Sequence, residues 1–155
     1  MKAVGNFALP PVGHVGIVVR NVERTVDFYS SAFGMGPFSI LEYTIEGAIL
    51  RGRPFKDRIK VAAAQQGPLA LELIEPLEEE GLYREFLLRK GEGLHHLGFH
   101  VNDIAGVLAE LAKQGTEPVF HSNLGPIPFA YLDTEKTGGV ILELIELRDR
   151  RREDR

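Results

Sequence analysis

Four histidine and glutamate residues occur in two matching pairs, and together they could bind a metal ion. His14 begins the segment His-Val-Gly-Ile-Val-Val, and His96 begins the similar segment His-Leu-Gly-Phe-His-Val. Glu72 and Glu143 hold the same place in two Leu-Glu-Leu-Ile-Glu segments. Two neutral imidazoles and two carboxylates suit a divalent ion such as zinc, cobalt, nickel, manganese or iron. Four protein ligands leave two positions open on an octahedral ion, which a substrate with two oxygen atoms could fill.

The apolar residues around each pair predict strands, and strands alternate the faces of their side chains. His14 then shares a face with Gly16, and His96 shares one with Gly98. A glycine two residues after each histidine leaves room for a ligand beside the imidazole. Ordinary structural roles also fit, because a lone histidine is often a hydrogen-bonded core residue and a strand glutamate often faces water. The recurrence of histidine and glutamate together favours the metal site.

The two pairs belong to an internal duplication. Residues 67–75 match residues 138–146 at six of nine positions, and the two histidine segments precede them in the same order. Similar residues between the matched segments stay in register. We interpret the chain as two modules, a linker with a short helix over 79–90, and a charged tail. The bounds are 14–75 for the first module, 76–95 for the linker, 96–146 for the second module and 147–155 for the tail.

Each module is predicted to fold as βαβββ, which makes the fold class α+β. A short apolar strand comes first in each, and a helical pattern follows. Asn21 can cap the first helix and Gly34 can end it, whereas Asp103 or Asn102 can cap the second before Gly115. Three further strands complete each copy. These strands are predicted over 37–46, 58–65 and 69–75 in the first copy and over 117–121, 128–133 and 139–146 in the second.

Composition excludes several classes of protein. The 155 residues contain no cysteine, so disulfides, zinc fingers, iron–sulfur clusters and thiol nucleophiles are ruled out. A net charge of −4 without a basic stripe argues against nucleic-acid binding. No segment approaches the ~20 apolar residues of a membrane span, and the N-terminus lacks a signal-peptide pattern. We therefore expect a soluble, cytoplasmic protein with no nucleic-acid or membrane partner.

Several segments resemble the vicinal oxygen chelate superfamily, which includes glyoxalase I, methylmalonyl-CoA epimerase, the extradiol dioxygenases and the bleomycin-resistance proteins. The segments that carry this resemblance are 14–19, 28–29, 33–34 and 71–76. Three others are most similar to the methylmalonyl-CoA epimerases. They are Ile59-Lys-Val-Ala62, Gly91-Glu-Gly-Leu-His-His-Leu-Gly98 and Thr137-Gly-Gly-Val-Ile-Leu-Glu143.

The resemblance implies a cupped, eight-stranded half-barrel built from two tandem βαβββ modules around one divalent ion, such as cobalt, manganese, nickel or zinc. The metal ligands that it implies are His14, Glu72, His96 and Glu143. In the adjacent pair His95–His96, we choose His96 because it is in register with His14, and we expect His95 to face the other way. We expect His100 to lie on the same face as His96, where it is a candidate for contact with the substrate.

The implied reaction is proton transfer α to an activated carbonyl, most simply the epimerisation of methylmalonyl-CoA, with Glu143 as the base. Some epimerases have a further glutamate on the third strand, where this chain has no carboxylate between Ile59 and Gln65. A basic loop beside the first module could meet the phosphates of a small acyl-CoA substrate, although a solvated surface loop is the simpler interpretation. Its residues are Arg51, Arg53, Lys56 and Arg58.

Other members of the superfamily provide the alternatives. A glyoxalase I-like lyase would use the same ligands, an extradiol dioxygenase would use two histidines and one glutamate on iron, and a metal-free binding protein of the bleomycin-resistance kind would use none. The superfamily also leads us to expect a homodimer. The apolar residues considered for its interface are Phe38, Ile40, Phe55 and Phe129.

Overall fold

The chain folds as β-α-β-β-β, then a helix, then a second β-α-β-β-β, in the computed structural model, which describes residues 7–125 and 127–147. The first set is β1 (His14–Val18), α1 (Val22–Phe33), β2 (Ser39–Leu50), β3 (Arg53–Gln66) and β4 (Leu69–Pro76). Helix α2 (Leu82–Lys90) leads to β5 (Gly93–Val101), α3 (Ile104–Ala112), β6 (Pro118–Ser122), β7 (Phe129–Leu132) and β8 (Ile141–Glu146). The predicted α+β class is confirmed. Nearly all of the predicted charged tail lies outside the described residues.

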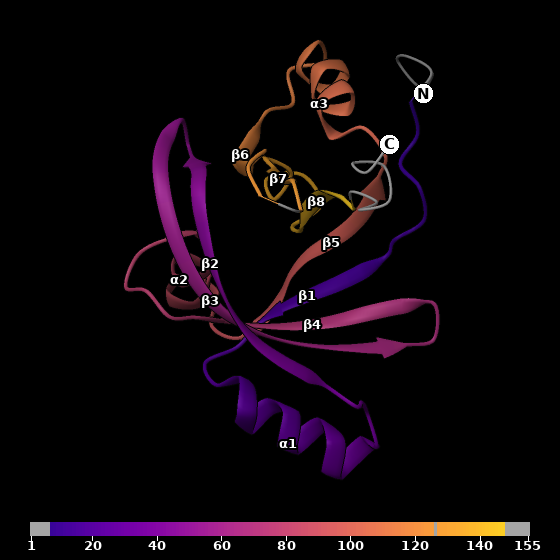
Figure 1. The fold of residues 1–155 in the computed structure, drawn as a ribbon, viewed down its shortest axis with the longest axis vertical. Coiled ribbons are helices and arrows are strands. Elements are labelled where there is room, and N and C mark those ends of the chain that lie inside the picture. The colour runs from indigo at the N-terminus through magenta and orange to yellow at the C-terminus, as the bar shows by residue number, and fades with distance from the viewer. Residues whose placement is uncertain (1–6, 126, 148–155) are drawn as a thin grey trace, which may run out of the picture.

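The eight strands form one mixed sheet that curls into a barrel in the order β1-β4-β3-β2-β6-β7-β8-β5. Within each half, the first strand pairs in parallel with the last, β1 with β4 and β5 with β8. The antiparallel pair β1–β5 joins the two halves, and these strands run side by side through the middle of the molecule (Figure 1). On the opposite side, only Ile49 and Leu50 of β2 pair with β6. The barrel is therefore firmly closed at β1–β5 and barely closed at β2–β6, which agrees with the expected cup.

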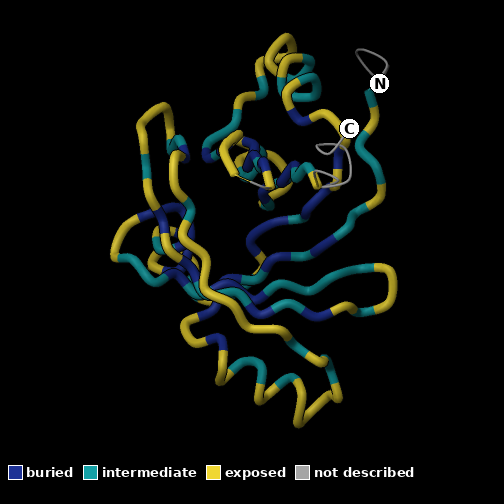
Figure 2. The backbone as a smooth tube through the Cα atoms, in the orientation of Figure 1, coloured by how far each residue is buried: buried dark blue, intermediate teal, exposed yellow. Residues whose placement is uncertain are grey.

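Three apolar clusters hold the elements together. One lies between α1 and the strands β3 and β4, and a second lies between α3 and the strands β5, β7 and β8. The third fills the barrel, where Tyr83 and Phe86 of α2 pack against residues from every strand except β5. Burial follows this arrangement, because the paired central strands are largely buried while the hairpin tips are exposed (Figure 2). Helix α2 thus belongs to the inside of the barrel, whereas α1 and α3 cover its outer face.

The second glutamate of each Leu-Glu-Leu-Ile-Glu segment fixes a helix. Glu75 accepts a hydrogen bond from the backbone N–H of Val22 at 2.9 Å, and Glu146 accepts one from Ile104, also at 2.9 Å. These amides are the first of α1 and α3, where a helix has unpaired N–H groups and favours negative charge. The predicted caps are confirmed, because Asn21 accepts from the N–H of Arg24 and Asp103 accepts from that of Gly106.

The hairpin of β2 and β3 is longer than predicted, and this changes the interpretation of the basic residues. Strand β2 runs to Leu50 and β3 begins at Arg53, so only a tight turn separates them. Lys56 and Arg58 therefore lie on a strand, and the predicted basic loop is wrong. Three of the four cations form ion pairs, Arg51 with Glu85, Lys56 with Glu46 and Arg58 with Glu78.

The predicted interface residues have mostly another role. Phe38 packs against the cluster under α1, and Phe55 and Phe129 pack against the cluster inside the barrel. Ile40, at 40% exposure, is the one of the four that faces solvent substantially. Among the described residues, no helix is both long and apolar enough to span a membrane.

Asp57 on β3 is a buried carboxyl group without full hydrogen bonding. One of its oxygens accepts from the N–H of Arg58 at 2.8 Å, and the other is buried with no hydrogen-bond partner among the described residues. Burial raises the pKa of Asp57 to about 6. The hydrogen bond from the N–H of Arg58 and the charge of Arg84 lower it in part, and the charge of Glu78 adds to the rise. The folded state therefore disfavours the ionised form of this side chain.

We predict that Asp57→Asn stabilises the fold at pH 7.5 by about 1–2 kcal/mol. A free aspartate has a pKa near ~3.9, so a folded value of about 6 means that stability is lost as the pH rises from about 4 to about 6. Two pKa units correspond to ~3 kcal/mol, and burying the amide offsets part of this gain. Urea unfolding at pH 4 and pH 7.5 measures the difference.

The control for this prediction is Asp27→Asn, because Asp27 is an exposed residue of α1. It should leave the free energy of unfolding nearly unchanged at both pH values. Equal stability of Asp57→Asn and the wild type at pH 7.5 would contradict the prediction.

Candidate metal centre

The four predicted ligands lie in two rows that cross the centre of the sheet. In each row a glycine pairs with a glutamate of its own half on one side and with a histidine of the other half on the other side. Residues directly opposite in neighbouring strands project their side chains to the same face. Both rows therefore direct an imidazole and a carboxylate towards the inside of the barrel. The rows are Glu72–Gly16–His96 and Glu143–Gly98–His14.

The glycines make room for the histidine of the opposite half. A Cβ atom on Gly16 would collide with the ring of His96, and one on Gly98 would collide with the ring of His14. Each imidazole thus lies directly over the glycine of the facing strand. The sequence-based interpretation, in which each glycine leaves space beside its own histidine, is wrong about the partner because it considers one strand at a time.

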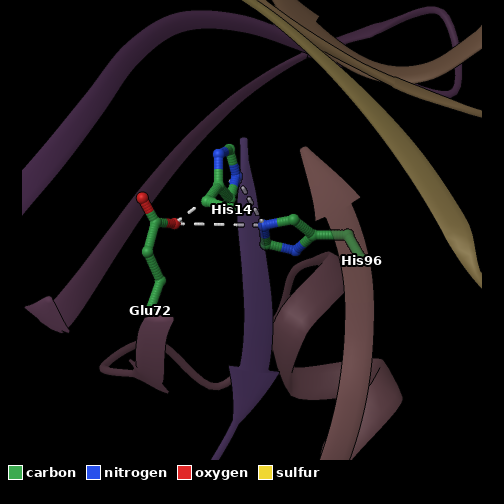
Figure 3. A group of neighbouring side chains, drawn as sticks. All are labelled: His14, Glu72 and His96. Carbon is green, nitrogen blue, oxygen red and sulfur yellow. Dashed lines mark hydrogen bonds and ion pairs between the residues drawn. The ribbon is translucent and has the colours of Figure 1, made fainter. Parts of the chain in front are cut away.

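The ligand atoms converge. Nε2 of His14 lies 2.6 Å from Oε2 of Glu143 and 3.3 Å from Nε2 of His96. Nε2 of His96 lies 3.2 Å from the same carboxylate oxygen. Glu72 approaches from the other side, with Oε2 at 3.7 Å from His14 and 3.9 Å from His96 (Figure 3). The structure therefore brings all four predicted ligands together.

These separations fit a small divalent ion. Metal–ligand bonds of ~2.0–2.2 Å put neighbouring ligand atoms about 3.0–3.6 Å apart. The observed separations between ligand atoms run from 2.6 Å to 3.9 Å, so they lie around this range. The ligand atoms of His14, Glu72 and His96 all lie within 4.8 Å of one another. The donor set, two nitrogens and two carboxylate oxygens, is the kind that zinc, cobalt, nickel, manganese and iron accept. The residues present are thus compatible with one such ion.

The two histidines and two glutamates shift one another's pKa values. Burial would raise the pKa of Glu143, but the charges and hydrogen bonds of His96 and His14 lower it to about 2. Burial would lower the pKa of His14, but the hydrogen bond with Glu143 and the charges of both glutamates raise it. Burial raises the pKa of Glu72, and repulsion from Glu143 adds to this. Glu143 is the enclosed carboxylate, with 6% of its side chain exposed, whereas Glu72, at 29%, faces the more open side.

His95 does not face away from His96, contrary to the prediction. Gly16 pairs with His96 while Ile17 pairs with Leu94, so His95 is the extra residue of a β-bulge on β5. A bulge interrupts the alternation of side chains and redirects the inserted residue. The ring of His95 is consequently buried beside that of His96, and both rings contact Tyr131. Nothing in the adjacent pair of histidines indicates a bulge, which depends on pairing with β1.

His100 lies at the outer end of the same strand. Its side chain is exposed, and its ring centroid is 5.8 Å from that of His14. Tyr131 is a neighbour of the site that the sequence analysis did not identify. It pairs directly with Glu143, and its ring lies 5.0 Å from that of His96. The pairing of β7 with β8 places it there, and no motif marks it.

Comparisons with known proteins agree with this architecture. An uncharacterised protein of Bacillus subtilis (strain 168), YqjC, is 29% identical over 136 residues, which cover 86% of this chain and 89% of the relative. The mitochondrial methylmalonyl-CoA epimerase of Dictyostelium discoideum is 21% identical over 150 residues, covering 92% of this chain and 82% of the relative.

A solved structure has the same fold. A single-residue variant of Streptomyces coelicolor methylmalonyl-CoA epimerase, in complex with 2-nitronate-propionyl-CoA, superposes with a TM-score of 0.67 at 23% identity. The match covers 92% of this chain and all of that chain, 100%. The family model of the Glyoxalase/Bleomycin resistance protein/Dioxygenase superfamily matches residues 13–131. With this match over most of its length, the chain belongs to that superfamily.

Proposed function

We propose that this protein is a metal-dependent isomerase that moves a proton on the carbon α to an activated carbonyl, with methylmalonyl-CoA as the favoured substrate. The observation that carries the proposal is that Glu72 and Glu143 each place a carboxylate oxygen within 3.9 Å of Nε2 of both His14 and His96. The epimerases of the same fold support the choice of an acyl-CoA, since one of them is bound to 2-nitronate-propionyl-CoA.

The two histidines and two carboxylates would hold one divalent ion. When bound, such an ion polarises a carbonyl oxygen as a Lewis acid and stabilises negative charge on it. The four side chains come from both halves of the sheet, so both halves together would hold the ion inside the barrel. Glu72, the more exposed carboxylate, marks the side from which substrate approaches.

Glu143 is the proposed base. Its carboxylate lies between both imidazoles, at 2.6 Å and 3.2 Å, so it is ionised and can accept a proton from a carbon held beside it. Strand β3 does not offer a second base near the centre. Ala63 pairs directly with Glu72, and the carboxylate Asp57 lies six residues away, about 20 Å along the strand. One base on one face of the α-carbon favours exchange of the proton over inversion.

A homodimer is part of the same proposal. Phe28 and Phe33 on α1 are 58% and 66% exposed, and Leu41 on β2 is 55% exposed. These apolar side chains form a better candidate interface than Phe38, Phe55 and Phe129, because those three pack into the protein's own clusters.

Metal binding depends on His96 in this proposal. We expect His96→Ala to abolish stoichiometric binding of cobalt or zinc, because it removes a buried ligand at the centre of the group. The matched control is His121→Ala, which removes a histidine from β6 outside the group. Elemental analysis and cobalt absorption titration measure the outcome. A wild-type protein that holds no divalent ion would instead support the metal-free binding protein.

Gly98→Ala tests the close approach of His14 to the facing strand. The added Cβ atom would occupy the place of the imidazole, so we expect the affinity for zinc to fall on the order of 100-fold or more. Gly93→Ala on the same strand is the control, because no atom lies within 4 Å of a Cβ built there. Calorimetric titration of both variants decides the point, and unchanged affinity in Gly98→Ala would contradict the proposed geometry.

The reaction is tested with glutamine at each carboxylate, since an amide oxygen can still bind a metal but cannot accept a proton. At saturating metal, we expect Glu143→Gln to lose about 100-fold or more of α-proton exchange in heavy water. Glu72→Gln should mainly weaken metal binding. Exchange and epimerisation are measured on the same methylmalonyl-CoA sample, and exchange should be the faster.

The reverse pattern, with exchange lost in Glu72→Gln and retained in Glu143→Gln, would assign the base to Glu72. If the metal-loaded protein catalyses neither exchange nor epimerisation, the epimerase proposal fails. The hemithioacetal of glutathione is then the substrate to try, because a glyoxalase I-like lyase would use the same ligands.

A further inference from the structure

The two adjacent histidines of β5 are in direct contact. Nδ1 of His95 lies 3.0 Å from Nδ1 of His96, and both side chains are buried, at 1% and 0% exposure. One nitrogen must donate and the other accept, because two lone pairs would repel. The far nitrogen of His96, Nε2, is the one that faces Glu143 and His14. The direction of the contact between the histidines therefore influences which nitrogen of His96 carries a lone pair.

The surroundings of His95 indicate the direction. Its Nε2 is buried and has no hydrogen-bond partner among the described residues. The ring of His95 lies among aromatic rings, with centroid-to-centroid distances of 4.9 Å to Phe86, 5.3 Å to Tyr83 and 5.7 Å to Tyr131. The hydroxyls of the two tyrosines bond to each other at 2.7 Å. No described residue donates a hydrogen bond to Nε2, so a lone pair there would be unused, whereas an N–H can point favourably at an aromatic ring. The proton of neutral His95 thus belongs on Nε2, which leaves Nδ1 as an acceptor.

We propose that His95 is a positioning residue, whose Nδ1 accepts a hydrogen bond from the Nδ1–H of His96. A metal ion that displaces the proton between Nε2 of His96 and Glu143 would then meet the Nε2 lone pair. The inference rests on the proposed metal centre for its functional consequence. The β-bulge is what makes the contact possible, since regular alternation would place His95 on the outer face of β5. Histidine ligands commonly donate their second N–H to an acceptor that fixes the ring and its tautomer.

A matched pair of variants separates this role from packing. Asn and Leu have nearly the same shape, and both leave the same space when they replace the ring of His95. His95→Asn places an amide oxygen near the position of Nδ1, whereas His95→Leu provides no acceptor. We expect His95→Leu to bind zinc about 10–100-fold more weakly than the wild type, and His95→Asn to recover most of that loss. His121→Leu is the control for loss of an imidazole elsewhere.

A spectroscopic measurement on the wild type does not depend on metal binding. Long-range ¹H–¹⁵N correlation spectra of chelator-treated protein at pH 8 report the tautomer of each neutral histidine. We expect His95 to carry its proton on Nε2 and to show a scalar coupling between its Nδ1 and that of His96. A proton on Nδ1 of His95 would overturn the inference, whatever the metal affinity.

The two readouts distinguish the possible failures. If His95→Asn and His95→Leu lose zinc equally, or if neither loses it, His95 serves packing alone and the inference is wrong. If the wild type binds no zinc but His95 has the expected tautomer and coupling, the hydrogen bond stands and the proposed function fails.

Discussion

The antiparallel pairing of β1 with β5 is the contact on which the candidate site depends. It sets His14 opposite Gly98 and His96 opposite Gly16, so each half of the sheet provides the glycine over which the histidine of the other half lies. Neither half could form this arrangement alone, because each ring lies over a glycine that the other half provides. The parallel pairs β1–β4 and β5–β8 then add one glutamate to each row.

The cost of burying charged groups explains much of the remaining local structure. Carboxylates are rarely enclosed unless positive groups or N–H donors compensate them. In each Leu-Glu-Leu-Ile-Glu segment one glutamate meets the histidines, and the other accepts from the first N–H of a helix on the opposite face. One repeated sequence thus connects the site inside the barrel to the helices outside it. Asp57 has only partial compensation, because one of its two oxygens has no hydrogen-bond partner among the described residues, and its pKa is raised.

The four candidate metal ligands limit the range of possible reactions, and the residues around them limit it further. One fold can support several reactions, so the four ligands by themselves distinguish poorly among them. Beside Glu72, β3 presents Ala63. A small apolar side chain at that place leaves room beside Glu72 and offers no proton acceptor. The bulged His95 and the aromatic rings around it form the opposite, enclosed side.

The sequence by itself determined the features that depend on local patterns and on the repeat. Asn21 and Asp103 cap helices because their short polar side chains reach nearby amides, and Gly34 ends α1 with a positive φ of 66°. The duplication predicted that the two histidines and two glutamates would lie on one face, and the structure brings them together. The direction of His95 and the partner of each glycine were decided by the tertiary structure. Both the bulge and the register arise from the pairing of β1 with β5, whose residues His14 and His96 are 82 positions apart in the sequence. No pattern within one strand contains that information.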